Sequence, residues 1–365
     1  MTVLETGAEV DFATGTLFTD SGLSVFASGA RADRSEVLCG DALDVLRGLP
    51  PTSVHCCVTS PPYWKQREYA SGGLGSETRL EAYIDALCEI LLEIKRVLTP
   101  QGSLWLNIGD VYRGKSLMGI PWRVAIKLMD EQGWILRNDV IWHKVKGSPD
   151  SSKDKLRHVY EDVFHFVKEK RCYYDMDAIR SKPRSAQVRN GAVVSATGVS
   201  GVRYRRQIEL STSLTDQEKS AALAALDQVL QDMALGKHSD FRMIIRGQQR
   251  VTHSDSESVS GRAKEIRDKG FYFLKFHPRG PKPSDVWDII PEDTQGRSSH
   301  FAPFPEDLCR VPILATCPPG GVVLDPFCGT GTALAVARSL GRRAVGIDIS
   351  PDYVAMSEER LGLLP

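Results

Sequence analysis

The stretch GVVLDPFCGTGTALAVARSLGRRAVGIDIS, residues 321–350, decides the fold class. Its apolar start, 321–325, is typical of a buried strand, and residues 332–340 have helical spacing. A Gly-x-Gly turn joins the two, and a second strand-like run follows at 343–349. A strand, a turn, a helix and a strand in this order are typical of α/β proteins.

The same alternation occupies most of the chain. Strand-like runs occur at 36–39, 54–59, 103–108, 134–142 and 160–167, and helical spacing occurs at 81–98 and 121–132. Pro100, Gln101 and Gly102 should break the chain before the third of these strands. The runs at 134–142 and 160–167 should pair with each other. We therefore predict a doubly wound, mostly parallel α/β sheet with helices on both faces.

Length and charge indicate an insert within this fold. The chain has 365 residues, enough for one large domain or for one domain with a substantial insert. Residues 178–282 hold 19 Lys and Arg against 10 Asp and Glu, whereas the remainder holds 27 against 36. Such a basic segment is suited to bind a polyanion. The alternative is that its charges only form a solvated surface. Inside this segment, Thr215 and Glu218 have the spacing of a capping box, which predicts a helix at 216–235.

Cysteine usage and hydropathy exclude other classes. The eight cysteines are scattered and form no Cys-x-x-Cys pair, so neither a disulfide framework nor a common zinc site is indicated. No run approaches about 18 apolar residues, and the N-terminus lacks a basic segment followed by an apolar one. We expect a cytoplasmic protein with reduced thiols, no bound metal and no membrane association.

The glycine turn of residues 321–350 has the features of a ligand site. Asp325 ends the first strand, Gly329 and Gly331 form the turn, and Asp348 ends the next strand. Glycines let a ligand approach the backbone, and the second acid can accept hydrogen bonds from a ribose. No Gly-Lys-Ser/Thr follows, and Leu334 stands where a dinucleotide site has its third glycine. S-adenosyl-L-methionine, an adenosine compound without phosphate, needs neither feature.

A second motif, TSPPYW at 59–64, follows another predicted strand. Its two prolines stiffen the loop and remove two backbone donors, which a simple strand stop would also explain. Together, TSPPYW and DPFCGTGT resemble the amino-group DNA methyltransferases of the β class. In that class the catalytic motif precedes the cofactor motif and the target-recognition region lies between them. The resemblance covers most of 36–180 and 270–361, and the central segment matches in position only.

The resemblance implies a Rossmann-like, S-adenosyl-L-methionine-dependent methyltransferase fold with an inserted domain. Its parts would be an N-terminal extension (1–35), a catalytic half (36–180), a target-recognition insert (181–275) and a cofactor-binding half (276–365). The implied partner is double-stranded DNA, and the protein would be a monomer or a homodimer. Whether a cognate restriction endonuclease acts on the same site stays open.

The catalytic residues implied by the resemblance are Ser60, Pro61, Pro62 and Tyr63. An exocyclic amino nitrogen is a poor nucleophile because its lone pair is delocalised into the ring. Acceptors aimed at both amino hydrogens favour the pyramidal form that can attack a methyl group. The Ser60 hydroxyl and the Pro61 carbonyl would be these acceptors. Tyr63, with Trp64 as a second candidate, would stack on the extruded base and offset the energy of flipping it.

The cofactor-binding residues implied by the resemblance are Asp41, Phe301, Asp325, Phe327, Gly329, Gly331 and Asp348. Asp348 would bind the ribose. Asp41 would receive the adenine amino group, and it is equally suited to cap a helix at 42–46. Phe301, in the stretch HFAPF, would close over the methionine end, whereas Trp287 should be a core ring.

Six arginines of the insert are candidates for binding DNA. They would divide into phosphate contacts and base contacts, unless they are solvated surface charges. These residues are Arg203, Arg205, Arg206, Arg242, Arg246 and Arg250.

The resemblance favours cytosine N4 as the methylated atom. Members with Ser before Pro-Pro-Tyr mostly modify cytosine N4, and members with Asp or Asn mostly modify adenine N6, which remains the alternative. Ring-carbon methylation would need a cysteine nucleophile, usually after a proline, and no Pro-Cys dipeptide occurs. Protein-glutamine methylation places the cofactor motif first, and an inactive DNA-binding subunit would not need both motifs. We predict a site-specific cytosine-N4 DNA methyltransferase.

Overall fold

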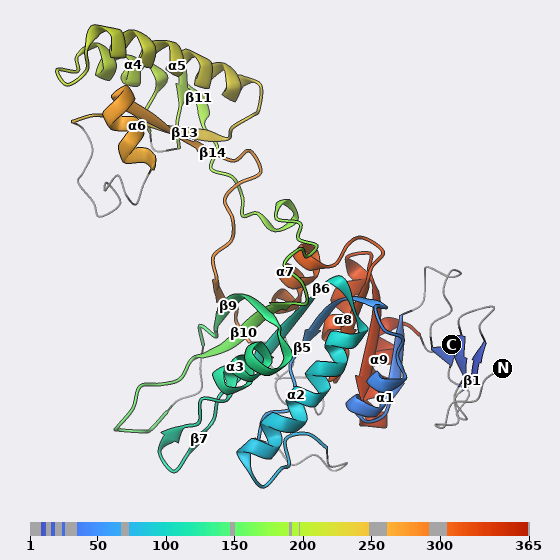
Figure 1. Ribbon diagram of the computed structural model, residues 1–365. Coiled ribbons are helices and arrows are strands. Elements are labelled where there is room, and N and C mark those ends of the chain that lie inside the picture. The colour runs from blue at the N-terminus through green and yellow to red at the C-terminus, as the bar shows by residue number, and fades with distance from the viewer. Residues whose placement is uncertain are drawn as a thin grey trace. The chain divides into compact units, whose positions relative to one another are not determined.

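The computed structural model describes residues 9–11, 16–18, 24–25, 35–66, 73–146, 150–189, 192–196, 198–247, 261–291 and 305–363. The chain divides into two compact units. The first, called the sheet unit here, comprises Met1–Asp175 and Ser284–Pro365, and the second, the insert unit, comprises Met176–Pro283. Figure 1 shows the course of the chain through each of them.

The sheet unit is built on eight strands in the order β15-β9-β10-β6-β5-β16-β17-β4 (Figure 1). They are β4 (Glu36–Cys39), β5 (Val54–Thr59), β6 (Leu98–Ile108), β9 (Ile135–His143), β10 (Tyr160–Val167), β15 (Val286–Asp288), β16 (Val322–Asp325) and β17 (Arg343–Asp348). β10 runs antiparallel to both β9 and β6, whereas the other neighbours pair in parallel. The mostly parallel sheet predicted from the sequence is confirmed.

Helices cover both faces of this sheet. One face packs against α1 (Ala42–Gly48), α2 (Leu80–Val97) and α3 (Ile120–Gln132), and the other against α7 (Glu306–Thr316), α8 (Thr332–Ser339) and α9 (Pro351–Leu361). Alternate side chains of a strand enter different cores, as the pleat requires: Leu104 and Leu106 face α2, and Trp105 faces the opposite core. The doubly wound arrangement is therefore confirmed.

The predicted break at Pro100–Gly102 is wrong as a strand boundary. β6 begins at Leu98 and continues through these residues. Val54 pairs with Leu98, but Cys56 already pairs with Ser103, so residues 99–102 form an irregularity in the ladder. Such an irregularity tolerates a proline and a glycine that regular pairing would exclude.

The sheet unit also carries smaller strands. β1 (Glu9–Asp11), β2 (Thr16–Phe18) and β3 (Ser24–Val25) form a separate antiparallel sheet, and β7 (Tyr112–Arg113) pairs with β8 (Ser116–Leu117). Among the described residues of the whole chain, no helix is long and apolar enough to cross a membrane.

The insert unit has its own core. Its elements are η1 (Asp177–Ile179), β11 (Gln187–Arg189), β12 (Ala192–Val194), α4 (Gly201–Glu209), α5 (Asp216–Ala234), β13 (Asp240–Ile245), α6 (Gly261–Lys269) and β14 (Phe271–Phe276). β13 and β14 pair antiparallel, and Phe241 of β13 is buried with Tyr204 of α4 and Leu226 of α5. The capping box of Thr215 and Glu218 at the start of α5 is confirmed.

The direction of winding changes between β5 and β16. From β5 the chain passes through α2 to β6 on one side, and from β16 it passes through α8 to β17 on the other. The two helices lie on opposite faces of the sheet. Open α/β sheets bind ligands at the carboxyl ends of strands that flank such a point. The sheet therefore places the loop that follows β5 beside the glycine turn that follows β16.

Candidate active site

The loop 60–63 begins where β5 ends and is held by α2 and by the core. Tyr83 of α2 donates a hydrogen bond to the Pro62 carbonyl at 2.9 Å. The Trp64 ring is only 7% exposed, and its Nε1 donates to the Glu77 carbonyl at 2.8 Å. Trp64 is therefore a core residue beneath the loop, and Tyr63 is the loop's remaining aromatic ring. The Pro61 carbonyl accepts no hydrogen bond from the described residues.

Four polar side chains meet at this loop: Ser60, Tyr63, Asn107 from β6 and Glu161 from β10. Tyr63 Oη donates to Glu161 Oε2 at 2.6 Å and lies 3.3 Å from Ser60 Oγ. Asn107 Nδ2 lies 3.2 Å from Ser60 Oγ, 2.9 Å from Tyr63 Oη and 2.9 Å from Glu161 Oε2. Lys144 Nζ donates to Glu161 Oε1 at 2.5 Å. β5, β6 and β10 are neighbours in the sheet, which brings these distant residues together.

The Tyr63 hydroxyl remains protonated in this cluster. Burial and then the neighbouring Glu161 carboxylate raise its pKa well above the ordinary value for tyrosine. Its ring lies against the backbone of Gly109, where a Cβ would stand 2.7 Å from Tyr63 Cε2. Only glycine permits this close approach, so Gly109 helps to fix the ring.

The glycine turn is joined directly to the end of β5. Thr59 Oγ1, at the end of β5, donates to Asp325 Oδ1 at 2.7 Å, and the Phe327 amide donates to the same oxygen at 3.1 Å. Asp325 is buried, and burial raises the pKa of its carboxyl to about 7. These two hydrogen-bond partners are neutral groups, so a cationic ligand nearby would favour the ionised form of this carboxyl.

Asp348 shapes the glycine turn as well as ending β17. Its Oδ2 accepts from the Gly329 amide at 2.9 Å, and its Oδ1 accepts from the Ser350 amide at 2.9 Å. Gly329 and Gly331 have φ values of 51° and 74°, in the left-handed region that favours glycine. A Cβ at Gly331 would also lie 2.9 Å from Ser357 Oγ, so both space and backbone conformation require this glycine.

Asp41 caps a helix beside this turn. Its Oδ1 accepts from the Leu43 amide at 2.9 Å and the Asp44 amide at 3.3 Å, which confirms the predicted capping of α1. β4 pairs with β17, and the Gly40 amide donates to the Asp348 carbonyl at 3.0 Å. The acids at 41 and 348 therefore stand at adjacent strand ends. Phe301, the remaining predicted cofactor residue, lies outside the described residues.

The chemistry of this edge fits S-adenosyl-L-methionine. Asp41, Asp325 and Asp348 place carboxyl groups at this edge, and the side-chain-free turn at Gly329 and Gly331 lies beside them. Carboxylates suit ribose hydroxyls, an amino group and positive charge, whereas they would repel a phosphate. The residues present are therefore suited to a cationic nucleoside without phosphate.

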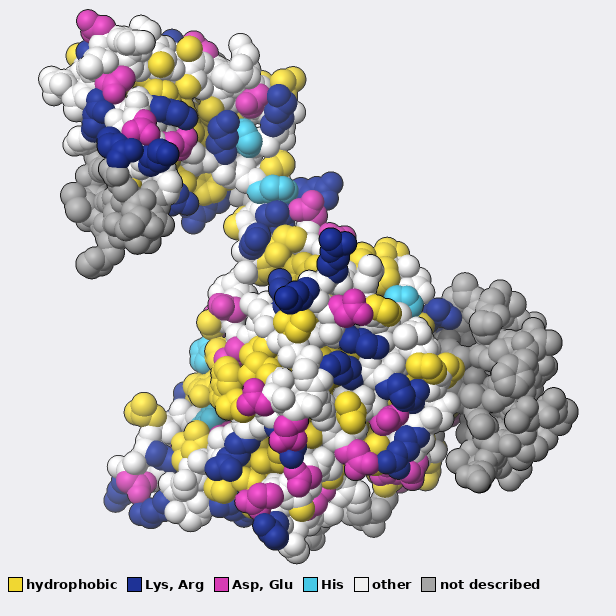
Figure 2. Space-filling model, in the orientation of Figure 1, with side chains coloured by type: hydrophobic (Ala, Val, Ile, Leu, Met, Phe, Trp, Pro, Cys, Tyr) yellow, Lys and Arg dark blue, Asp and Glu magenta, His cyan; other side chains and the backbone are white. Residues whose placement is uncertain are grey.

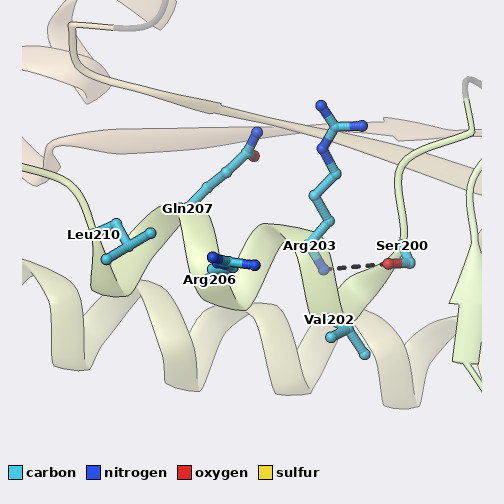
Figure 3. Close-up of a pocket in the computed structure, with 6 residues that line it drawn as sticks. All are labelled: Ser200, Val202, Arg203, Arg206, Gln207 and Leu210. Atoms are coloured by element: carbon cyan, nitrogen blue, oxygen red, sulfur yellow. Dashed lines mark hydrogen bonds between the residues drawn. The ribbon is translucent and has the colours of Figure 1, made fainter.

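The exposed side of α4 carries two of the predicted DNA-binding arginines. Arg203 and Arg206 are exposed and make no ion pair among the described residues, and between them Tyr204 enters the core. They line a shallow hollow with Ser200, Val202, Gln207 and Leu210 (Figure 3). Figure 3 shows Arg203 and Gln207 extending from the same side of the helix, and Figure 2 shows Lys and Arg side chains across the visible face of the insert unit.

Two other predicted arginines are engaged inside the insert unit. Arg246 Nη2 contacts both Glu218 oxygens, at 2.8 and 2.6 Å, and it also donates to the Ser213 carbonyl at 2.9 Å. Arg205 forms an ion pair with Asp227 of α5. Arg242 is exposed on β13, and Arg250 lies outside the described residues. The predicted arginines that the structure describes thus occupy different environments. Arg203 and Arg206 are the two that are exposed on α4.

Sequence reasoning missed Asn107, Glu161 and Lys144, as well as the contact made by Thr59. A signal was present, because Asn107 and Glu161 are among the polar residues of two mostly apolar strand patterns, SLWLNI and YEDVFHFV. A polar side chain in a buried strand needs a partner, so it marks a candidate site. The sequence does not show which partner it meets.

Known proteins resemble the chain in sequence and fold. A family model described as DNA methylase, of the N6 and N4 type, matches residues 54–359. Type II methyltransferase M.SfiI of Streptomyces fimbriatus is 31% identical over 86% of this chain and 88% of its own length. Type II methyltransferase M.Cfr9I of Citrobacter freundii is 31% identical over 88% and 86%. The solved PvuII DNA methyltransferase, cytosine-N4-specific, has 18% identity and a TM-score of 0.54, and covers 90% of this chain and 86% of that chain. The last likeness is one of fold.

Replacing Asp325 with Asn should weaken the pH dependence of stability. The pKa of Asp325 in the folded protein, about 7, is raised above its ordinary value of 3.8, so the stabilising contribution is complete below 3.8 and is lost as pH rises through 7. The loss is at most about 1.4 kcal/mol per pH unit. Asn keeps an acceptor for Thr59 but does not ionise. Urea unfolding without cofactor measures the free energy of unfolding of both proteins at each pH. We expect that of the wild type to fall relative to that of the variant as pH rises from 3.8 to 7. Parallel curves of stability against pH would contradict a buried titrating carboxyl.

Proposed function

Because the chain belongs to the N4 and N6 amino-methylase family of DNA methylases, we propose that it methylates the N4 amino group of cytosine at a specific site in double-stranded DNA. It is an S-adenosyl-L-methionine-dependent type II DNA methyltransferase, and the proposal concerns its target atom. The observation that carries it is Ser60, a neutral hydroxyl held by Asn107 and Tyr63 at the end of β5. Adenine N6 is the alternative.

The loop 60–63 would prepare the amino group of the extruded base. When bound, S-adenosyl-L-methionine would supply an electrophilic methyl group to the amino nitrogen; its sulfur would keep the electron pair of the broken carbon–sulfur bond, and the proton lost from nitrogen would pass to water. Ser60 Oγ and the Pro61 carbonyl would accept the two amino hydrogens and so favour a nitrogen whose lone pair is available. Tyr63 would stack on the base, contributing about 1–3 kcal/mol.

The carboxyl edge of β4, β16 and β17 would hold the cofactor. Asp348 would accept hydrogen bonds from the ribose, and Asp41 would receive the adenine amino group. The turn at Gly329 and Gly331 would let the nucleoside approach the backbone, with Phe327 beside it. The buried Asp325 would supply negative charge toward the positive end of the ligand.

The insert unit would recognise the target sequence. Residues 181–275, which the sequence assigns to this role, lie inside it, and the basic segment 178–282 carries a formal charge of +9. Arg203, Arg206 and Gln207 project from α4, and these residue types contact phosphates or pair with guanine and adenine edges. A cognate restriction endonuclease acting on the same site is the proposed functional partner, because the relatives are type II methyltransferases.

The methylated product tests the target atom directly. Unmethylated DNA is incubated with the purified protein and S-adenosyl-L-methionine carrying a labelled methyl group, then digested to nucleosides for mass spectrometry. We expect labelled N4-methyldeoxycytidine, and none from a Ser60→Ala variant. Labelled N6-methyldeoxyadenosine would reject the cytosine assignment in favour of the alternative. Label found in protein and absent from DNA would reject DNA methylation altogether.

Replacing Tyr63 with Ala should lower turnover about 10- to 100-fold, because the stacking energy of an aromatic ring on a base is lost. The affinity for S-adenosyl-L-methionine should stay near the wild-type value, since the cofactor residues lie on other strands. Single-turnover methylation and calorimetry measure the two quantities separately. Near-normal methylation by the variant would exclude Tyr63 as the stacking residue.

Neutralising Arg203 or Arg206 should alter DNA binding in one of two ways. A phosphate contact, when lost, lowers the slope of log affinity against log salt by about one for every sequence alike. A lost base contact relaxes discrimination at one base pair by about 1–3 kcal/mol. Binding of cognate and scrambled duplexes across a salt series distinguishes these. Arg47→Ala, which removes an exposed arginine paired with Glu89 in α2 of the sheet unit, is the matched control; if the α4 variants behave like it, α4 does not bind DNA.

A further inference from the structure

The Glu161 carboxylate dictates the direction of the hydrogen bonds around Ser60. An ionised carboxylate can only accept, so the two groups at Glu161 Oε2 must both donate to it. These are the Tyr63 hydroxyl at 2.6 Å and the Asn107 amide nitrogen at 2.9 Å. Asn107 is 2% exposed, and its Oδ1 has no hydrogen-bond partner among the described residues. The amide therefore faces the cluster with its nitrogen, although its buried oxygen stays unpaired.

The direction of these hydrogen bonds also determines the role of the Ser60 hydroxyl. Because the Tyr63 hydrogen points to Glu161, the Tyr63 oxygen can accept the hydrogen of the Ser60 hydroxyl, 3.3 Å away. The second hydrogen of Asn107 Nδ2 lies between Tyr63 Oη at 2.9 Å and Ser60 Oγ at 3.2 Å, so Asn107 occupies at most one lone pair of Ser60. A hydroxyl has one hydrogen and two lone pairs, so one lone pair of Ser60 remains. Ser60 is thus left as an acceptor.

Lys144 fixes the other end of the carboxylate. Its Nζ lies 2.5 Å from Glu161 Oε1, and the Glu161 side chain is 11% exposed. A carboxylate so far from water needs a charged partner, which Lys144 supplies. Lys144 can only donate, so whatever atom faces it must be an acceptor. The donors on both carboxylate oxygens of Glu161 therefore fix the direction of the hydrogen bonds in the cluster.

We propose that Glu161 is a positioning residue that orients the Tyr63 and Asn107 hydrogen bonds so that Ser60 Oγ meets the target amino group as an acceptor. This inference rests on the proposed methylation of a base amino group at Ser60. It applies equally to cytosine N4 and adenine N6, because each amino group presents hydrogens to Ser60. Glu161 itself touches neither the base nor the cofactor in this scheme.

A glutamine at position 161 would reverse the direction of the cluster. Its oxygen would turn to the ammonium of Lys144, which places its NH2 group against both groups that donate to Glu161 in the wild type, the Tyr63 hydroxyl and the Asn107 amide. Both would lose their acceptor, while Asn107 would still direct its other hydrogen toward Ser60 and Tyr63. Tyr63 would then donate to Ser60, and the Ser60 hydrogen would turn outward. A donor would face the amino hydrogens of the base, and the activating hydrogen bond would be lost.

The test compares Glu161→Gln with a double variant, Lys144→Met with Glu161→Gln. The single variant should methylate DNA about 10- to 100-fold more slowly in a single turnover, the range expected for losing a hydrogen bond to a charged group. Its affinities for S-adenosyl-L-methionine and for DNA should stay within about twofold. Without Lys144, the glutamine oxygen is free to face Tyr63, so the double variant should recover several-fold of the lost rate. Glu93→Gln, at a part-buried glutamate paired with Arg96 in α2, is the matched control and should keep the wild-type rate.

Three outcomes would overturn the proposal. These are a wild-type rate for Glu161→Gln, a parallel loss of rate and of both affinities that marks a purely structural role, and a double variant no faster than the single one. The nucleoside made by the wild-type protein is determined in the same experiment. N6-methyldeoxyadenosine would reject the cytosine assignment while leaving the Glu161 comparison intact, so the two ideas fail separately.

Discussion

The hydrogen bond from Thr59 to Asp325 is the interaction on which the site depends. It joins residues 266 positions apart in the chain and connects the ends of two paired parallel strands, β5 and β16. Because the chain winds away from these strands in opposite directions, the loops that follow them meet at one edge of the sheet. The loop 60–63 and the glycine turn are therefore both anchored at this edge, and a shift of one strand would displace both.

The cluster around Ser60 accepts an energetic penalty that a purely structural core would avoid. It holds a nearly buried carboxylate and an amide oxygen that finds no partner in the described part of the chain. An unsatisfied buried acceptor costs about 1–3 kcal/mol, and a buried ion pair is often no better than an apolar replacement. Such penalties concentrate at functional sites, where the direction of a hydrogen bond matters more than its contribution to stability. Asn107 and Glu161 fit this pattern.

In the insert unit, arginines have different roles that depend on their positions. Arg203, Tyr204, Arg205 and Arg206 are consecutive on α4, and helical spacing sends them in different directions: Tyr204 into the core, Arg205 to Asp227 and the other two outward. Arg246 stabilises the start of α5 through the same Glu218 that completes its capping box. A count of positive charge treats these arginines alike. Their hydrogen-bond partners distinguish the arginines that stabilise the insert unit from the arginines that are available to a polyanion.

The sequence predicted the doubly wound sheet and the two motif loops from local signals, because hydrophobic periodicity, glycine turns and paired prolines act over short stretches of chain, and its two motifs carried the resemblance to the family. It also indicated both roles of Asp41, and the structure shows the helix cap. Only the tertiary structure decided that β6 continues through residues 99–102 and that Trp64 belongs to the core. It likewise brought together Ser60 and Tyr63 from the loop after β5, Asn107 from β6 and Glu161 from β10. The physical reason is that strand pairing and burial depend on residues far apart in the chain, and no local pattern encodes which of them will meet.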